Sequence, residues 1–185
     1  MLVRLQIEGR QVAARAGATV MEAAQQAGIY IPSLCSHTAL PSHGTCRICM
    51  VGIEGVPGYP TACTTPVEEK MVVWVNPPEV LQLRRSILEH VVVSTQHPRT
   101  CLECHRRERC SPTMTCQRLL TVRNMEKCLF CPQNQRCELQ RAATHIGVNP
   151  VPAIPYKYPG LPVLPGGPFF DREYNLCIVC GLCVR

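Results

Sequence analysis

Aromatic residues are scarce in this chain, whose 185 residues include one Trp, three Phe and five Tyr. Hydrophobic residues make up 46% of the sequence, but no run approaches the ~18 apolar residues that a membrane-spanning helix needs. The N-terminal MLVRLQIEGR lacks the charged and apolar regions of a secretory signal peptide. We therefore expect a cytoplasmic protein that does not insert into a membrane. Such a protein can still be part of a membrane-associated complex.

Motifs for nucleotide binding and for catalysis of covalent bond changes are missing as well. The sequence contains no GxGxxG fingerprint, no P-loop and no recognisable pair of nucleophile and base. We therefore expect neither an NAD site nor a catalytic substrate site in these residues. Whether the protein counts as an enzyme, or only as a component of one, stays open.

Cysteine, by contrast, is abundant, with 14 copies in the chain. In a reducing compartment such enrichment indicates metal binding rather than disulfides. The chain has a net charge of +6, and residues 97–141, with nine Lys and Arg against four Glu, carry a local charge of +5. This basic charge is compatible with two kinds of site. It can offset the negative charge of thiolate-ligated clusters, or it can serve a zinc module that binds nucleic acid.

The N-terminal part of the chain has the pattern of a small α+β domain. Residues 2–16 alternate as two strands with a turn at Glu8 and Gly9. Thr19 and Glu22 have the spacing of a capping box, which predicts the start of a short helix.

Further elements are expected after this helix. Residues 29–44 are rich in Pro, Ser and Gly and predict a loop, whereas residues 47–53 and 71–75 favour strands. A helix is expected from Pro77 or Pro78 to about residue 92. The apolar residues that we expect on one face of this helix are Val80, Leu83, Ile87 and Val91.

The first four cysteines have the spacing C-x10-C-x2-C-x13-C. They are Cys35, Cys46, Cys49 and Cys63. A loop that delivers three sulfurs, with a fourth from a later segment, suits a [2Fe–2S] core, and plant-type ferredoxins use a related loop. A zinc site with four cysteines has the same ligand types, so the spacing alone does not choose the metal.

The sequence around these cysteines resembles a known family. The segments IPSLCSH, GTCRICMVGIEG and PTACTTPVEEKMVV are similar to the N-terminal ferredoxin-like domain of the largest peripheral subunit of respiratory complex I. The same domain recurs in NAD-linked hydrogenase and diaphorase subunits and in NAD-dependent formate dehydrogenases. The resemblance covers residues 1 to about 110. It implies a β-grasp fold with one [2Fe–2S] cluster on Cys35, Cys46, Cys49 and Cys63.

The stretch HPRTCLECHRRERC carries the next motif, H-x3-C-x2-C-x5-C. Taken alone, three cysteines and a histidine suit zinc as well as iron. The resembling family continues with the same motif, which there binds a [4Fe–4S] cluster. The resemblance therefore implies a [4Fe–4S] site on His97, Cys101, Cys104 and Cys110.

A repeat of this spacing follows. CLFCPQNQRC shares the pattern C-L-x-C-x4-R-C with CLECHRRERC, but Asn124 stands where the first copy has its histidine. Cys116 is the natural fourth ligand. From the repeat we infer a second [4Fe–4S] site on Cys116, Cys128, Cys131 and Cys137. A zinc clip or partly free thiols are the alternatives.

The last three cysteines have the spacing C-x2-C-x2-C. They are Cys177, Cys180 and Cys183. The segment FFDREYNLCIVCGLCVR resembles the family's next [4Fe–4S] module, but a fourth cysteine would fall beyond Arg185. Either the sequence is a fragment of a longer protein or the three cysteines bind an incomplete cluster, and we favour the fragment.

Together the motifs predict an α+β protein in which small cluster-wrapping segments of helix and loop follow the β-grasp domain. The expected parts are a [2Fe–2S] ferredoxin-like domain (1–78), a one-His, three-Cys [4Fe–4S] segment (79–115), a four-Cys [4Fe–4S] segment (116–148), a Pro-rich strap (149–170) and the start of a truncated [4Fe–4S] module (171–185).

The resemblance implies an iron–sulfur electron-transfer subunit or domain of an NAD(P)H-linked oxidoreductase complex. Its expected partners are a flavin/NAD(P)H-binding subunit and a second redox catalytic subunit, joined in a hetero-oligomer without nucleic acid. Two alternatives stay open. One is a zinc-binding interaction or nucleic-acid-binding module, and the other is a stand-alone ferredoxin-like carrier.

Overall fold

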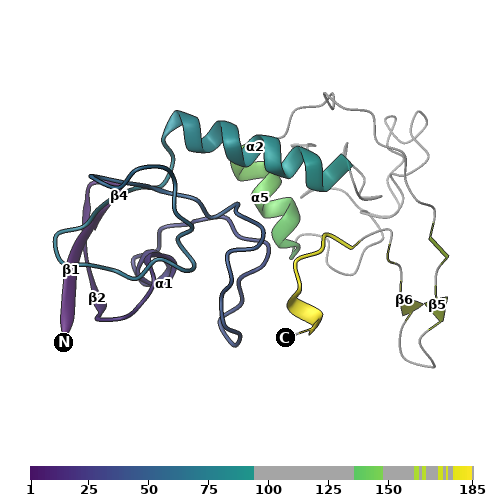
Figure 1. The fold of residues 1–185 in the computed structure, drawn as a ribbon, viewed down its shortest axis with the longest axis horizontal. Coiled ribbons are helices and arrows are strands. Elements are labelled where there is room, and N and C mark those ends of the chain that lie inside the picture. The colour runs from purple at the N-terminus through teal and green to yellow at the C-terminus, as the bar shows by residue number, and fades with distance from the viewer. Residues whose placement is uncertain are drawn as a thin grey trace. The chain divides into compact units, whose positions relative to one another are not determined.

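The structure, a computed structural model, describes residues 1–93, 136–147, 161–162, 164–165, 171–172, 174 and 177–184 (Figure 1). The chain forms two compact units. One comprises Met1–Ile87 together with Cys180–Arg185, and the other comprises Leu88–Val179.

The first unit is built on a small mixed sheet with the strand order β2-β1-β4-β3. Strand β1 (Leu2–Ile7) pairs antiparallel with β2 (Arg10–Arg15) and parallel with β4 (Val72–Trp74). Strand β4 pairs antiparallel with the short β3 (Gly52–Ile53). A mixed sheet with few helices confirms the expected α+β class.

The turn between β1 and β2 has the two residues expected from the sequence. Ile7 pairs with Arg10, so Glu8 and Gly9 alone form the loop. Both have positive φ, 50° and 76°, as the tight turns of twisted hairpins require. The Glu8 carboxylate also accepts hydrogen bonds from the backbone N–H groups after β4, including that of Asn76 at 3.0 Å. The turn is thereby tied to the segment that leads into the next helix.

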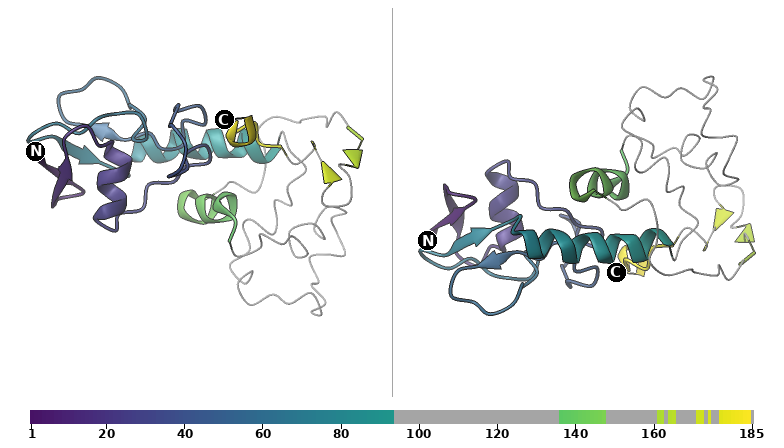
Figure 2. Two further views of the ribbon diagram at one scale, coloured as in Figure 1. Left: turned by 90° about the horizontal axis from the view of Figure 1, so that it is seen from below. Right: turned by 90° about the horizontal axis from the view of Figure 1, so that it is seen from above.

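Helix α1 (Val20–Gln26) begins with the predicted capping box. The Glu22 N–H donates to the Thr19 hydroxyl at 3.2 Å, and the Thr19 N–H donates to the Glu22 carboxylate at 2.7 Å. The buried side chains of α1 belong to the same apolar core as those of β1 and β2, and the helix lies beside these strands in each view (Figure 2).

Helix α2 (Pro78–Val93) begins and ends close to the predicted bounds. Of the four apolar residues expected on one face, Val80 is fully buried, and Ile87 and Val91 are half-buried. Leu83 is 42% exposed, whereas Val80, Arg84 and Leu88 are each 0% exposed. The buried row follows i, i+4, i+8 spacing and includes the cation Arg84. A search for apolar residues alone does not detect this row.

The strand predicted at residues 47–53 forms only at Gly52–Ile53. Arg47 has a φ of 54°, which no strand residue adopts, and Met50 makes a single bridge to Thr61. The apolar residues of this stretch are buried in a loop rather than in a strand. Residues 29–44 contain neither helix nor strand, as predicted.

The described part of the second unit contains helix α5 (Glu138–Ile146), which buries Leu139, Gln140, Ala142, Ala143 and Ile146. Gly147, with a φ of 71°, ends the helix. Two short strands, β5 (Leu164–Pro165) and β6 (Asp171–Arg172), pair antiparallel. Most of the predicted Pro-rich strap, residues 149–170, lies outside the described residues.

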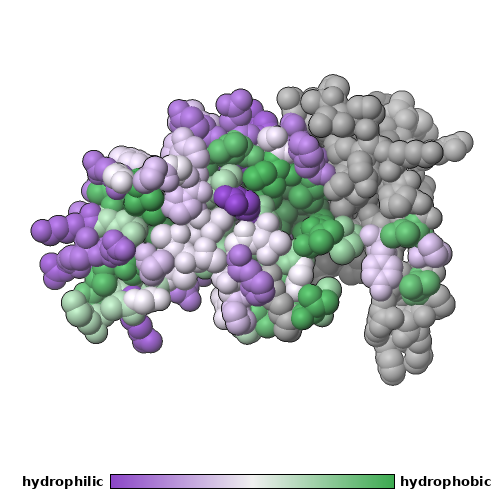
Figure 3. All heavy atoms as spheres, viewed as in Figure 1, coloured by the Kyte–Doolittle hydropathy of each residue, from purple (hydrophilic) through white to green (hydrophobic). Residues whose placement is uncertain are grey.

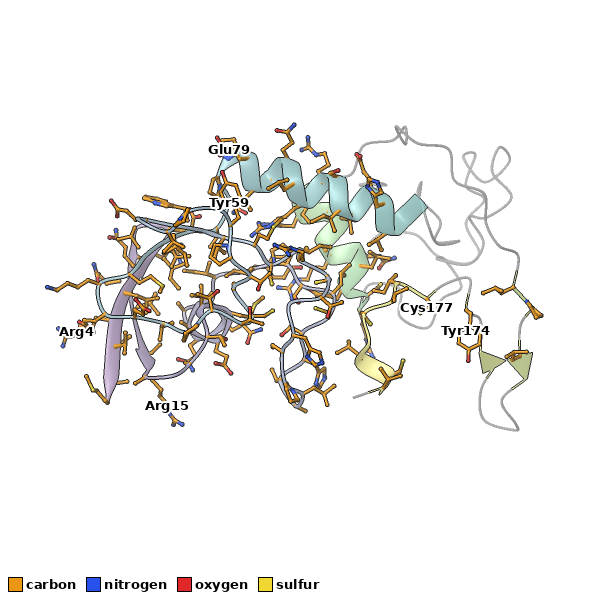
Figure 4. All side chains as sticks on the ribbon, viewed as in Figure 1. Arg4, Arg15, Tyr59, Glu79, Tyr174 and Cys177 are labelled. Atoms are coloured by element: carbon orange, nitrogen blue, oxygen red, sulfur yellow. The ribbon has the colours of Figure 1, made fainter. Side chains whose placement is uncertain are left out.

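The hairpin end of the first unit has a mixed surface, with polar side chains beside the exposed Met1 and Leu2 (Figure 3). Arg4 and Arg15 extend away from the domain in Figure 4. Within the described residues, no helix combines the length and the apolar character that crossing a membrane requires.

Candidate metal centre

Four cysteines of the first unit lie close together in two pairs. The Cys46 N–H donates to the Cys35 sulfur at 3.3 Å, and the sulfurs of Cys49 and Cys63 lie 3.4 Å apart. None of the four is in a disulfide, and the 3.4 Å between the Cys49 and Cys63 sulfurs is far beyond the length of a disulfide bond. Cys63 contributes to raising the pKa of Cys35, and Cys46 contributes to raising the pKa of Cys49. Because such effects act at short range, the two pairs lie near one another. The structure thus brings together the four cysteines of the first predicted site.

Three of these thiols are withdrawn from water. Cys35, Cys49 and Cys63 are at most 1% exposed, and Cys46 is partly exposed. Burial raises the pKa of Cys35 to about 11. The hydrogen bond with Cys63, together with burial, raises the pKa of Cys49 far above its ordinary value. These sulfurs need a positively charged partner to become thiolates, and a metal core supplies one.

A short antiparallel ladder holds the two cysteine-bearing loops against each other. The Val51 N–H donates to the Pro60 carbonyl, and the Ala62 N–H donates to the Cys49 carbonyl, both at 2.9 Å. The first turn of α1 fixes the same ladder, because the Met21 N–H donates to the Ala62 carbonyl at 2.9 Å. The capping box that starts α1 therefore also positions the loop that carries the fourth cysteine.

Left-handed backbone conformations shape the loop around Cys46. Gly44 and Arg47 have φ values of 66° and 54°. A Cβ at Gly44 would lie 3.0 Å from the Thr61 hydroxyl oxygen, so a side chain has no room there. These two residues turn the chain so that Cys46 and Cys49 both point into the site.

Arg84 is a site residue that the sequence reasoning missed. Its side chain is 0% exposed, donates through Nη2 to the Met50 carbonyl, and donates through Nη1 to Asn76 Oδ1 at 3.0 Å. Its Nε has no hydrogen-bond partner among the described residues. Burial lowers the pKa of Arg84 to about 10, an effect that the nearby Cys49 opposes. The i, i+4, i+8 row with Val80 and Leu88 was the signal in the sequence.

The donor set is compatible with a two-iron core. Among the described residues, no three His, Cys, Asp or Glu side chains converge on one ion position. A [2Fe–2S] core needs two pairs of thiolates, one for each iron, and not a convergent triad. The 3.4 Å between the Cys49 and Cys63 sulfurs is close to the roughly 3.7 Å edge of a tetrahedron with metal–sulfur bonds of about 2.3 Å.

The structure describes only part of the other predicted sites. The sites on His97, Cys101, Cys104 and Cys110 and on Cys116, Cys128 and Cys131 lie outside the described residues. Cys137 is partly exposed and precedes α5 as its N-cap. Cys177 and Cys183 are exposed and Cys180 is partly exposed; Cys177 is labelled in Figure 4. Between them, Val179 has a φ of 54°, a strained conformation for a β-branched residue.

Comparison with known proteins gives matches over the whole chain. Residues 1–78 match the family model of a 2Fe-2S iron-sulfur cluster binding domain. Subunit gamma of the NAD-reducing hydrogenase HoxS of Cupriavidus necator is 27% identical over 100% of this chain and 65% of its own length. The NADH-ubiquinone oxidoreductase 75 kDa subunit of Reclinomonas americana is 35% identical over 100% of this chain and 22% of its own length.

A solved structure is similar as well. The crystal structure of an NAD+-reducing [NiFe]-hydrogenase in the H2-reduced state contains a chain that is 26% identical, with a TM-score of 0.70. The match covers 98% of this chain and 64% of the hydrogenase chain.

The mixed sheet and the two pairs of cysteines, together with the family match, support a 2Fe-2S iron–sulfur site in the first unit. Residues 1–78 match the model of the 2Fe-2S iron-sulfur cluster binding domain, and the chain is homologous to subunits of NADH-ubiquinone oxidoreductases and NAD-reducing hydrogenases. The chain spans about a fifth of the oxidoreductase subunits and 65% of the hydrogenase subunit. These relatives do not favour a zinc-binding or nucleic-acid-binding module.

Proposed function

We propose that this chain is an electron-transfer module of an NAD(P)H-linked oxidoreductase complex. The observation that carries the proposal is the pairing of four buried or half-buried thiols in a domain of the 2Fe-2S family. Cys35 and Cys46 would bind one iron of a [2Fe–2S] core, and Cys49 and Cys63 would bind the other. When bound, such a core supplies a one-electron redox centre.

The residues of the chain prepare the site for this role. The Cys46 N–H, donated to the Cys35 sulfur at 3.3 Å, stabilises negative charge on that sulfur. The burial of Cys35, Cys49 and Cys63 excludes water from the sulfurs. Hydrogen bonds to sulfur and exclusion of solvent are two of the means by which a protein sets the potential of an iron–sulfur centre.

The fold that we propose for residues 1–78 is a β-grasp. The strand order β2-β1-β4-β3, with a parallel pair in the centre and α1 between β2 and β3 in the chain, supports this assignment. The cysteine-bearing loops lie between α1 and β4 in the chain.

We further propose two [4Fe–4S] sites after this domain. Their ligands would be His97, Cys101, Cys104 and Cys110 in residues 79–115, and Cys116, Cys128, Cys131 and Cys137 in residues 116–148. Cys177, Cys180 and Cys183 would begin another cluster module after the strap at 149–170. The support is the cysteine spacing, the internal repeat and relatives that match along the whole chain.

Single electrons would pass between a flavin/NAD(P)H-binding subunit and a second redox catalytic subunit. The relatives are named as subunits of NAD- and NADP-linked enzymes, which supports a hetero-oligomer. We place the module in a reducing compartment such as the cytoplasm, because its cysteines must remain available as ligands and not form disulfides.

Metal and sulfide analysis of anaerobically purified protein tests this function. We expect iron and acid-labile sulfide each near about ten per chain, from one [2Fe–2S] and two [4Fe–4S] cores, or more if the last cysteines also bind iron. About two to four zinc ions without sulfide would contradict the proposal and favour a zinc module. A [2Fe–2S] signal with only about two irons would limit the function to the first domain.

A further inference from the structure

Among the residues that the structure describes, the buried guanidinium of Arg84 donates hydrogen bonds to neutral groups. These are the main-chain carbonyl of Met50 and the side-chain oxygen of Asn76, and Nε has no hydrogen-bond partner among the described residues. The nearby Glu8 carboxylate is exposed, and its Oε1 accepts from the N–H groups of Val75 and Asn76 instead. A fully buried cation without a buried counter-charge is costly, so the protein needs a negative group near this position.

The hydrogen bond to Met50 places that cation at the metal centre. Met50 follows Cys49 directly and bridges to Thr61 in the ladder that leads to Cys63. The guanidinium therefore reaches the backbone of the loop that carries one sulfur pair. A [2Fe–2S] core on four thiolates has a net charge of about −2 when oxidised and about −3 when reduced, and it can supply the missing counter-charge.

We propose that Arg84 is the charge-balancing residue of the [2Fe–2S] site, and that its buried positive charge favours the reduced form of the core. The inference rests on the ligand set proposed above. The reduced core carries one more negative charge than the oxidised core, so a fixed cation stabilises the reduced form more. Arg84 acts on the core through this charge and through the loop that it holds, without binding iron itself.

A purely structural role is the alternative. Arg84 also fastens α2 to the loop at Met50 and to Asn76, so its loss could weaken the fold. The two roles differ in what they change. A structural role lowers the unfolding free energy of the iron-free protein, whereas a charge-balancing role changes the reduction potential of the assembled core.

The experiment compares three variants of the full 185-residue chain with the unchanged protein. Arg84→Met removes the charge, Arg84→Lys keeps it without the planar donor geometry, and Arg85→Met removes the same charge at the adjacent, exposed position. Iron and sulfide are counted after anaerobic reconstitution. The [2Fe–2S] potential is then measured by redox titration followed by electron paramagnetic resonance, and the iron-free proteins are unfolded with urea.

We expect Arg84→Met to disfavour reduction by about tenfold or more, which equals about 59 mV for one electron. Arg84→Lys and Arg85→Met should remain within about threefold of the unchanged protein. An unchanged potential in Arg84→Met, or an equal shift in Arg85→Met, would overturn the inference. If Arg84→Met assembles no core, the test rests on Arg84→Lys. A shift of about tenfold in the reduction equilibrium of Arg84→Lys, despite its retained charge, would also overturn the inference.

Two further outcomes have a defined meaning. If neither Arg84 variant assembles a core, the inference is overturned, because Arg84→Lys keeps the positive charge and the residue is then needed for its geometry and not for its charge. Absence of a [2Fe–2S] signal in the unchanged protein instead contradicts the proposed function and is seen before any variant is made.

Discussion

The sulfurs of Cys49 and Cys63 lie 3.4 Å apart although 14 positions separate the two residues in the sequence. The ladder between residues 49–51 and 60–62 creates this proximity, and α1 supports it from the other side. The pair is therefore formed by hydrogen bonds of the protein itself. A metal core would bind to a site whose ligands the fold already holds together, which lowers the ordering cost of binding.

Replacement of one member of this pair should remove the [2Fe–2S] core. A serine at position 63 provides a poorer ligand for iron than a thiolate, so Cys63→Ser should lose about two irons and about two sulfides per chain. The [2Fe–2S] resonance should disappear with them. Metal analysis and electron paramagnetic resonance of the reduced protein provide the measurement.

Cys183→Ser makes the same chemical change outside residues 1–78 and serves as the control. Its [2Fe–2S] resonance should equal that of the unchanged protein. Retention of the full resonance in Cys63→Ser would show that the core has a different ligand set.

The loop around Cys46 should be sensitive to a single methyl group. Gly44→Ala combines a positive φ of 66° with a Cβ that would lie 3.0 Å from the Thr61 hydroxyl. We expect the unfolding free energy of the iron-free protein to fall by about 2–3 kcal/mol. Because the loop positions two proposed ligands, the iron content after reconstitution should fall as well.

Gly55→Ala separates the cost of positive φ from the cost of the contact with Thr61. Gly55 has a similar φ of 77°, but no atom lies within 4 Å of the position that its added methyl group would take. This variant should lose only the backbone contribution of about 1 kcal/mol and should keep its iron. Equal losses in the two variants, measured by urea unfolding, would contradict a steric role of Thr61.

Local signals in the sequence were sufficient where short-range chemistry decides the structure. The dipeptide of Glu8 and Gly9 between two alternating runs predicted a turn, with Gly9 free to adopt positive φ, and the structure confirms it. Thr19 and Glu22 predicted a capping box, whose two hydrogen bonds are present. The cysteine spacing indicated one four-sulfur site, and the structure brings those four residues together.

Long-range packing was beyond such signals. The run that begins at Arg47 has strand propensity, but the loop must turn at that residue to direct its cysteines inward, so only Gly52–Ile53 joins the sheet. The four apolar residues expected on one face of α2 did not identify its fully buried row, because periodicity arguments assign cations such as Arg84 to the solvent. Nothing local indicates that Arg84 finds oxygen acceptors on Met50 and Asn76 in the interior.

The capping box of α1 should contribute measurably to stability. Thr19→Ala removes the hydroxyl that accepts from the Glu22 N–H, and the loss should be about 1 kcal/mol, or about 4–8 °C in Tm for a domain of this size. Thr19→Ser keeps the hydroxyl and should stay close to the unchanged protein. Thermal unfolding followed by circular dichroism distinguishes the variants, and equal Tm values for Ala and Ser would contradict the role of the cap.

The inferred third cluster depends on Cys116, because the repeat supplies only three cysteines after it. Cys116→Ser should therefore remove about four irons and about four sulfides per chain. The [2Fe–2S] resonance should persist, because its proposed ligands all lie within residues 1–78. Ser111→Ala, a change five positions before Cys116 that removes no sulfur, should leave the iron content unchanged. Full iron content in Cys116→Ser would mean that the repeat at residues 128–137 binds no iron through Cys116, and zinc analysis of the same sample would then show whether those thiols hold zinc instead.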